Sequence, residues 1–240
     1  MNSSAPSRWD ALADTLGGLS LPADFFPRAD LYLDALAAAN AGVNLVSFDP
    51  LRDGPAHVAD SLQALRGLPG RIRTGIDVGT GGGFPGIPLA LALPECRVVL
   101  LDGIRKKQAA VSGLAVAAGA GNVSALWGRA EELAREGEQR ETHDVAFCRA
   151  VGRLPVVLEL TLPFVRVGGL CLLHRGLEAP GELEAAITHL GDLGARSGGL
   201  IGYRLPGTDH DRFIVCIEKT DQIEDRYPRR PGIPAKRPLW

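Results

Sequence analysis

Cysteine is scarce in this chain, and long apolar runs are missing from it. The four cysteines, Cys96, Cys148, Cys171 and Cys216, lie far apart, with no Cys-x-x-Cys pair and no metal-ligand spacing to a histidine. This pattern is typical of reduced, buried thiols, so we expect neither disulfides nor a metal site. No run approaches the roughly 18 apolar residues that a membrane span needs. The first seven residues also have neither the basic nor the apolar part of a secretory signal. We therefore expect a cytoplasmic protein without a membrane partner.

Acidic and basic residues nearly balance, which argues against a chain that binds nucleic acid over its whole surface. The net charge of the 240 residues is −2, and 45% of them are hydrophobic, which favours one domain with an appendage. The charge is uneven, however, because residues 226–240 hold five basic side chains and no acid. This asymmetry indicates either an anionic partner or a solvated basic tail.

The most informative stretch is DVGTGGGFPG, residues 77–86. It follows an alternating apolar run, residues 72–78, and leads into the apolar segment 88–93, so the order predicts a strand, a glycine turn and a helix. Glycine permits positive φ angles and a close approach of backbone to a ligand, and the first N–H groups of the helix face that ligand. The next apolar run, residues 97–102, ends in a carboxylate suited to ribose hydroxyls. The candidate cofactor-binding residues are therefore Asp77, Gly79, Gly81, Gly83, Phe84 and Asp102.

The glycines fit two cofactors. The spacing Gly79-x-Gly81-x-Gly83 suits S-adenosylmethionine enzymes, whereas Gly81-x-Gly83-x-x-Gly86 satisfies the dinucleotide pattern. An ordinary tight turn that binds nothing is a third interpretation, which the carboxylate of Asp102 makes less attractive.

The rest of the chain predicts three parts. Residues 1–70 show helical spacing and read as a helical cap, residues 71–220 alternate strands and helices, and residues 221–240 form a basic, proline-rich tail. The expected helices are 9–19, 29–39, 55–65, 88–93, 106–118, 130–136, 155–165 and 181–193, and the expected strands are 72–78, 97–101, 123–126, 144–148, 169–174, 200–205 and 212–218.

The last strands of this pattern distinguish S-adenosylmethionine from a dinucleotide as the expected cofactor. Repeated strand–helix units demand a mostly parallel sheet covered on both faces, and the two final strands predict an antiparallel end. Such a seven-stranded, Rossmann-like α/β sheet characterises class I S-adenosylmethionine-dependent methyltransferases. A short-chain dehydrogenase would also need a Tyr-x-x-x-Lys pair, which Tyr32, Tyr203 and Tyr227 do not supply. We therefore expect S-adenosylmethionine as the cofactor.

The segment after the fourth strand, Cys148-Arg149-Ala150, bears on the methyl acceptor. It lacks the Asp/Asn-Pro-Pro-aromatic segment of exocyclic amine methylation. Cys148 is either the nucleophile of a pyrimidine carbon methyltransferase or a small core residue, and the core reading is favoured. An arginine-rich site suits an acceptor with a lone pair and no proton to lose inside an anionic polymer, such as guanine N7. Arg149 and Arg129 are the candidate catalytic residues, although either is alternatively an ion-pairing arginine.

Nearly the whole chain resembles the bacterial small-subunit ribosomal RNA guanine-N7 methyltransferases, the RsmG or GidB family. The motifs that carry the resemblance are NLVS (44–47), HVADSL (57–62), DVGTGGGFPGIPL (77–89), LD (101–102), RKK (105–107), GRAE (128–131), CRA (148–150) and RYPRRPGIPAK (226–236). Two departures are Arg175, where the family usually has lysine, and Ala59, where it has a bulkier apolar residue. His57 is read as a packing residue rather than a catalyst.

The resemblance implies methyl transfer from S-adenosylmethionine to one guanine N7 of 16S ribosomal RNA. Alternatives are another RNA, a small-molecule acceptor, or a Rossmann-like binding module without catalysis. The resemblance places Gly79, Phe84, Ala130, Glu131 and Arg149 at the cofactor. Together with the basic tail, it gives the candidate RNA contacts Lys106, Lys107, Arg129, Arg175, Arg212, Arg229 and Arg230. We expect a monomer whose partner is 16S RNA or the small ribosomal subunit.

Overall fold

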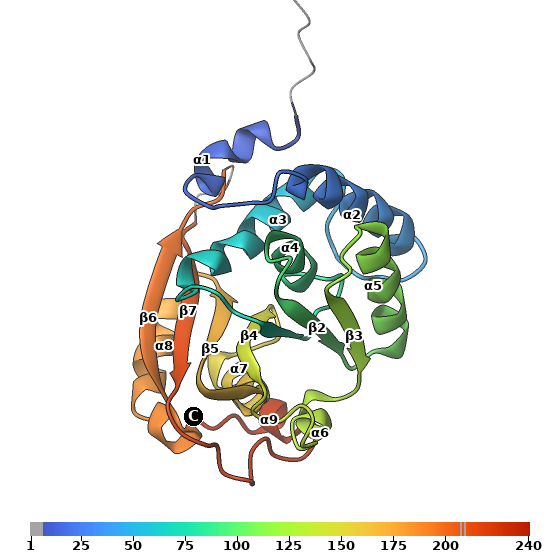
Figure 1. Ribbon diagram of the computed structural model, residues 1–240. Helices are drawn as coiled ribbons and strands as arrows, with labels where there is room; N and C mark the ends of the chain where they lie inside the picture. Colours follow the sequence, from blue (N-terminus) through green and yellow to red (C-terminus); the bar gives the residue numbers. More distant parts are fainter. Residues whose placement is uncertain (1–6, 207, 209) are drawn as a thin grey trace, which may run out of the picture.

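The computed structural model describes residues 7–206, 208 and 210–240. Its centre is a seven-stranded sheet in the order β3-β2-β1-β4-β5-β7-β6 (Figure 1). The strands are β1 (Thr74–Val78), β2 (Arg97–Asp102), β3 (Val123–Trp127), β4 (His143–Arg149), β5 (Val165–Arg175), β6 (Ala195–Tyr203) and β7 (Arg212–Lys219). Strands β1 to β5 run parallel to one another, whereas β7 is antiparallel to both β5 and β6. The predicted fold class, with its antiparallel end, is confirmed.

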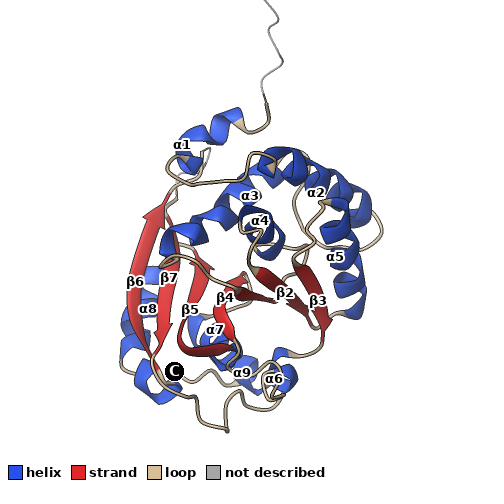
Figure 2. Ribbon diagram, viewed as in Figure 1, coloured by secondary structure: helices blue, strands red, loops and turns tan. Residues whose placement is uncertain are grey.

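Helices cover both faces of the sheet (Figure 2). On one side lie α2 (Phe25–Asn40), α3 (Gly54–Leu62), α4 (Gly86–Ala92) and α5 (Arg105–Ala117), and on the other lie α6 (Ala130–Leu133), α7 (Leu154–Thr161), α8 (Ala179–Ile187) and α9 (Ile233–Lys236). The N-terminal α1 (Ala13–Leu16) follows the short 3₁₀ turn η1 (Asp10–Leu12), and η2 (Gln63–Gly67) continues α3. The remaining 3₁₀ turns are η3 (Leu162–Phe164) and η4 (Leu190–Leu193).

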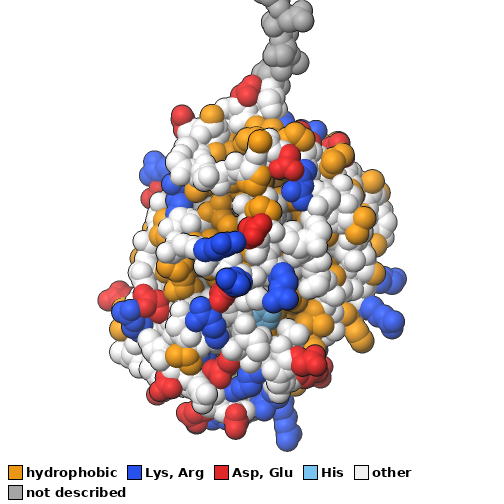
Figure 3. Space-filling view, in the orientation of Figure 1, with side chains coloured by type: hydrophobic (Ala, Val, Ile, Leu, Met, Phe, Trp, Pro, Cys, Tyr) orange, Lys and Arg blue, Asp and Glu red, His pale blue; other side chains and the backbone are white. Residues whose placement is uncertain are grey.

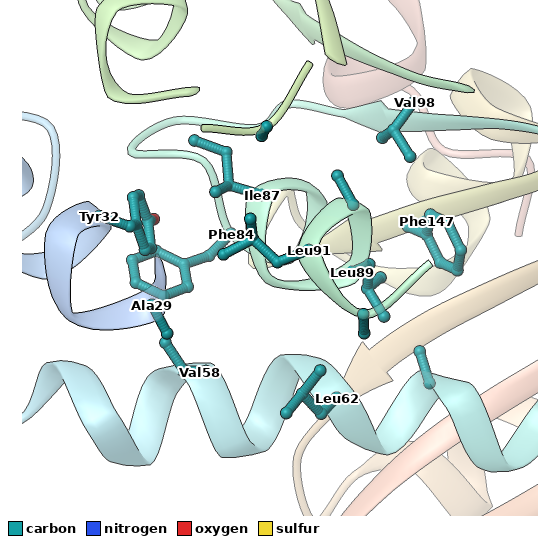
Figure 4. Close-up of a cluster of buried hydrophobic side chains, with 14 of the residues drawn as sticks. Ala29, Tyr32, Val58, Leu62, Phe84, Ile87, Leu89, Leu91, Val98 and Phe147 are labelled. Carbon is teal, nitrogen blue, oxygen red and sulfur yellow. The ribbon is translucent and has the colours of Figure 1, made fainter. Parts of the chain in front are cut away.

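The helical cap packs directly on the first face of the sheet. Tyr32 of α2 and Leu62 of α3 are fully buried in the same core as Leu89 of α4 and Val98 of β2 (Figure 4). The apolar residues of α2 recur at helical spacing, which is why one face of this helix is buried. Since cap and sheet share one core, the cap is held rigidly over the loops that follow β1 and β4.

Several element boundaries differ from the expected ones; for example, the helix expected at 181–193 ends at Ile187 and is followed by the turn η4. The helix expected to reach residue 165 ends at Thr161, because Pro163 lacks the N–H that would continue it, and β5 begins at Val165. Strand β6 begins at Ala195 rather than at residue 200, with a bulge between Ser197 and Gly199. The tail contains α9, which the proline-rich composition did not predict.

Positive and negative side chains are interleaved with apolar ones on the face drawn in Figure 3. This mixture agrees with the near-neutral net charge of the chain. Within residues 7–206, 208 and 210–240, no helix combines the length and the apolarity needed to cross a membrane.

Candidate active site

The strand order reverses between β1 and β4, and two adjoining recesses open where these strands end. A crevice at such a point is where open α/β sheets bind their ligands. The first recess, of about 220 Å³, runs from Gly79 and Asp102 to Ala130 and Glu131. The second, of about 460 Å³, runs from the same Gly79 and Asp102 to Arg149. Their shared wall makes one elongated site.

The glycine loop after β1 forms that shared wall. Gly79, Gly81 and Gly83 have φ angles of 80°, 56° and 100°, which L side chains rarely adopt. A Cβ on Gly79 would lie 2.6 Å from Val151 Cγ2. The loop is fixed to β2 because the N–H groups of Gly79 and Thr80 both donate to the carbonyl of Leu101, at 2.9 and 3.0 Å. The positive φ angles and the close approach of Val151 explain why glycine occupies these positions.

Asp77 supports the loop from behind instead of facing the recesses. Its fully buried carboxylate accepts the Gly86 N–H at the start of α4 at 2.9 Å. Burial raises the pKa of this carboxyl to about 7. Asp77 therefore holds the helix against the strand, and its predicted role in cofactor binding is reduced to an indirect one.

Asp102, at the end of β2, lies where both recesses meet. One carboxylate oxygen accepts the Gly81 N–H at 3.0 Å, and the other accepts the Ile104 N–H at 2.8 Å. Each carboxylate oxygen has room for a second hydrogen bond, so this side chain can also accept two ribose hydroxyls. The turn-stabilising and ligand-binding roles are thus compatible, as expected.

We expect Asp102→Ala to weaken the binding of S-adenosylhomocysteine by about 1–3 kcal/mol, because the ribose hydroxyls and the Gly81 N–H lose their acceptor. Asp102→Asn keeps one acceptor oxygen, so its affinity should fall between those of Asp102→Ala and the unsubstituted protein. Isothermal titration calorimetry measures both affinities. Equal affinities for all three proteins would show that Asp102 stabilises the turn and does not bind the ligand.

The first recess combines an apolar wall with a buried carboxylate. Val156 and Leu160 of α7 give it an apolar wall, and Glu131 lies at its edge with its residue only 5% exposed. The Arg129 guanidinium is 3.3 Å from Glu131 Oε1, while its own side chain is half-exposed at the rim. Pro234 and Ala235 of the tail complete the lining.

The second recess is walled by the cap. The Asn40 carboxamide shapes this wall, since its oxygen accepts the N–H groups of Leu45 and Val46 at 2.8 and 3.0 Å. Phe48 then stacks on His57, with ring centroids 3.6 Å apart, and Phe84 packs against both rings. An aromatic cluster therefore lies beside Arg149 in the second recess.

Arg149 is anchored in the same recess by the cap helix α3. Its guanidinium lies 2.9 Å from the buried carboxylate of Asp60 and donates to the His57 carbonyl at 3.2 Å. A second nitrogen of the guanidinium donates to His57 Nδ1. Burial and the neighbouring Arg149 charge lower the pKa of His57 to about 4, so the imidazole is neutral and accepts this bond.

Asp60 is the hub of a larger network. Its carboxylate also accepts the Tyr203 hydroxyl at 2.7 Å and lies 3.6 Å from the Arg212 guanidinium. Burial alone would raise the pKa of Asp60, but the Arg149 charge and its other partners hold it below the usual value. Asp60, Arg149, Arg175 and Arg212 line a third recess that adjoins the second through Arg149. Cationic side chains thus continue from the second recess into the third.

Comparisons with known proteins decide the family. Residues 26–194 match the family model described as GidB: rRNA small subunit methyltransferase G. The chain belongs to the GidB family. It is 40% identical over 230 residues to the ribosomal RNA small subunit methyltransferase G of Deinococcus deserti, covering 93% of this chain and 94% of that protein. It is 39% identical over 236 residues to the protein of the same name from Synechococcus elongatus, with 94% of both chains covered.

Two solved structures share the fold of this GidB-family chain at low sequence identity. The cofactor-bound Rv0187 from MTB is 20% identical, with a TM-score of 0.59 over 91% of this chain and 100% of that one. The O-methyltransferase TomG from Streptomyces achromogenes, in complex with SAM, is also 20% identical, with a TM-score of 0.57 over 89% and 98% of the two chains. Their fold is that of class I methyltransferases, in agreement with the sheet order.

Most of the predicted cofactor residues meet in the GidB-family site, but the predicted RNA contacts are scattered. Lys107 lines the second recess, and Lys106 is exposed on α5. Arg175 pairs with Glu182 of α8, where its Nε lies 2.9 Å from Oε2. Arg230 is exposed, whereas Arg229 forms an ion pair with the fully buried Glu159. The Arg229 guanidinium thus has a counter-charge within the fold, and its role as an RNA contact stays a prediction.

The surroundings of Cys148 fit a small core residue and not a nucleophile. The residue is buried at the end of β4, and burial raises the pKa of its thiol well above the ordinary value. The thiolate is the reactive form, so this environment suppresses nucleophilic attack. Across the described ranges 7–206, 208 and 210–240, His, Cys, Asp and Glu side chains form no group of three that could hold a metal ion.

The sequence analysis missed Asp60, Phe48 and Tyr203. His57 was read as a packing residue, and it does pack on Phe48, but it also accepts a bond from Arg149. The available signal was the spacing of His57 and Asp60, three residues apart, which puts both on one face of a helix. Their partner Arg149, however, lies about 90 residues further along the chain.

Proposed function

We propose that this protein transfers the methyl group of S-adenosylmethionine to N7 of a guanine in 16S ribosomal RNA of the small ribosomal subunit. The relatives named ribosomal RNA small subunit methyltransferase G support the substrate class. The elongated site fits the cofactor, since its first recess suits adenosine and Asp102 suits the ribose. The glycine loop lies between the first recess and Arg149, where the rest of the cofactor would extend.

The observation that carries the proposal is the character of the second recess. Among its described lining residues, Asp102 is the one carboxylate, and both of its oxygens already accept backbone N–H groups. A general base is not needed for N7, because its lone pair attacks without losing a proton. When bound, S-adenosylmethionine supplies a methyl group on a positively charged sulfur. The residues of the recess then contribute by orienting the purine and excluding water.

Arg149 is suited to orient the acceptor. Its guanidinium is fixed in position by Asp60 and His57, lies 5.5 Å from the centre of the Phe84 ring, and borders both the second and the third recess. A planar guanidinium stacks on a base or donates to its edge, and Arg212 in the next recess is placed for a flanking phosphate. Arg129, at the rim of the first recess, is placed to act on cofactor or RNA from the other side.

Methylation of purified small subunits and of naked 16S RNA with labelled S-adenosylmethionine tests the proposal. We expect label in one guanine, located by mass mapping, and no label in small subunits that already carry the modification. Label on an exocyclic amine, on a pyrimidine or in another RNA would contradict the acceptor. Binding of S-adenosylhomocysteine without any transfer would indicate a binding module instead.

A further inference from the structure

The basic tail is bound along the side of the domain and passes the first recess before it ends at Trp240, whose ring stacks on His189. In Figure 1 its helix α9 lies beside α6 and α7, the two elements that wall the first recess. Arg135 donates to the carbonyls of Arg226 and Pro228 at 3.1 and 2.5 Å, and Arg140 donates to the carbonyl of Tyr227 at 2.9 Å. Side chains of the domain thus satisfy the backbone of this segment.

A buried ion pair fixes the middle of the tail. The two guanidinium nitrogens Nε and Nη2 of Arg229 lie 2.8 and 2.6 Å from the two oxygens of Glu159 on α7. The Arg229 backbone N–H also donates to Glu159 Oε1 at 2.8 Å, and Glu159 is fully buried. A bidentate pair of this kind is short and geometrically specific, so it sets the register of the tail on α7. The positive charge of Arg229 is therefore already balanced by Glu159.

Three residues beyond this pair, the tail reaches the pocket itself. Gly232, with a φ of 79°, turns the chain and donates its N–H to Glu131 Oε1 at 2.9 Å. Pro234 and Ala235 of α9 then line the first recess together with Ala130 and Val156. The tail therefore contacts Glu131 directly and supplies part of the wall opposite the glycine loop.

We propose that residues 226–236 are a wall of the cofactor pocket, and that Glu159 and Arg229 are positioning residues for cofactor binding. They act on the adenosine part of S-adenosylmethionine through Gly232, Glu131 and α9. This inference rests on the proposed assignment of the first recess to adenosine. Because the docked tail completes the pocket, the bound cofactor and the docked tail stabilise each other by the same factor.

The first test compares Glu159→Gln, Arg229→Met and the control Arg237→Met, at an exposed tail residue beyond the proposed wall, by calorimetric titration with S-adenosylhomocysteine. We expect the first two to weaken binding roughly tenfold, within the usual range of such couplings, and the control to bind normally. Turnover at saturating cofactor and RNA should stay within about twofold of normal in all three, so the defect appears in the KM for the cofactor. Normal affinity in folded Glu159→Gln and Arg229→Met would overturn the proposal.

A second test needs no substitution. Trypsin cleaves after Arg229 only when the ion pair with Glu159 opens, and saturating S-adenosylhomocysteine should slow this cleavage roughly tenfold in the unsubstituted protein. Equal cleavage rates with and without the ligand would overturn the proposal even if the variants fail to fold. If the intact protein binds no S-adenosylhomocysteine at all, the proposed function fails instead. Weaker RNA binding of Arg229→Met with normal cofactor affinity would return the tail to the RNA interface.

Discussion

Asp60→Ala is expected to lower the turnover number for methyl transfer by about 100-fold, the scale of an error of about 1 Å in the position of reacting groups. Asp60 is 1% exposed and fixes Arg149, Tyr203 and Arg212 at once. Without its carboxylate, the Arg149 guanidinium is left largely buried without its counter-charge. Removing one partner of such a pair costs about 3–5 kcal/mol of folding free energy. Single-turnover kinetics and urea unfolding measure the two effects separately.

Asp53→Ala is the matched control, because Asp53 precedes the same helix but forms an exposed pair with Arg52. It should change neither turnover nor stability noticeably. Asp60→Asn should retain the acceptor for Tyr203 while losing the charge, so its turnover is expected between those of Asp60→Ala and the unsubstituted protein. Normal turnover in a folded Asp60→Ala would show that Arg149 does not depend on its anchor.

Local sequence patterns predicted the parts of the site that are local in the chain. The glycine loop, the carboxylate of Asp102 and the segment Gly128–Glu131 each lie directly after a strand, and parallel strands bring their ends to one edge of the sheet. The seven strands and the antiparallel end followed from the alternation of apolar runs. These features depend on neighbours within about ten residues, which is why spacing was enough.

The contacts that tie distant segments together could not be read in this way. Asp60 and Arg149 are on different elements, and their pairing depends on how the cap packs against α4. The basic residues of the tail are equally compatible with a solvated RNA-binding arm and with ion pairs inside the fold. Glu159, which pairs with Arg229, is in sequence a single acid within an apolar helix.

The conformation of Ala150 is a further feature that spacing did not reveal. This residue follows Arg149 and has a φ of 59°, in the left-handed region that favours glycine. A non-glycine residue held there stores strain, and such residues cluster at ligand sites because the surrounding structure over-determines them. The strained turn after β4 and the positive φ angles after β1 face the same second recess. We therefore expect the backbone of both loops to take part in ligand binding.

Gly81→Val is expected to reduce the affinity for S-adenosylhomocysteine by at least about 100-fold, or about 2.7 kcal/mol. Gly81 has a φ of 56°, and a left-handed conformation costs an ordinary L residue about 1–2 kcal/mol and a β-branched one more. A Cβ at this position would lie 3.8 Å from its nearest neighbour, the Leu45 carbonyl oxygen, so the side chain itself meets little protein. Its methyl groups would instead occupy the recess, and relaxation of the backbone would break the bond from the Gly81 N–H to Asp102.

A graded series distinguishes a specific effect on the loop from general unfolding. Gly81→Ala adds only the Cβ and should lose less affinity than Gly81→Val, while both keep the far-ultraviolet circular dichroism of the parent. Gly113→Ala is the control, because Gly113 is exposed in α5 and a Cβ there meets nothing within 4 Å. That change should leave the affinity intact and stabilise the helix by up to about 1 kcal/mol. If Gly81→Val binds as tightly as Gly113→Ala, the cofactor does not pass over this loop, and the elongated site must be assigned to another ligand.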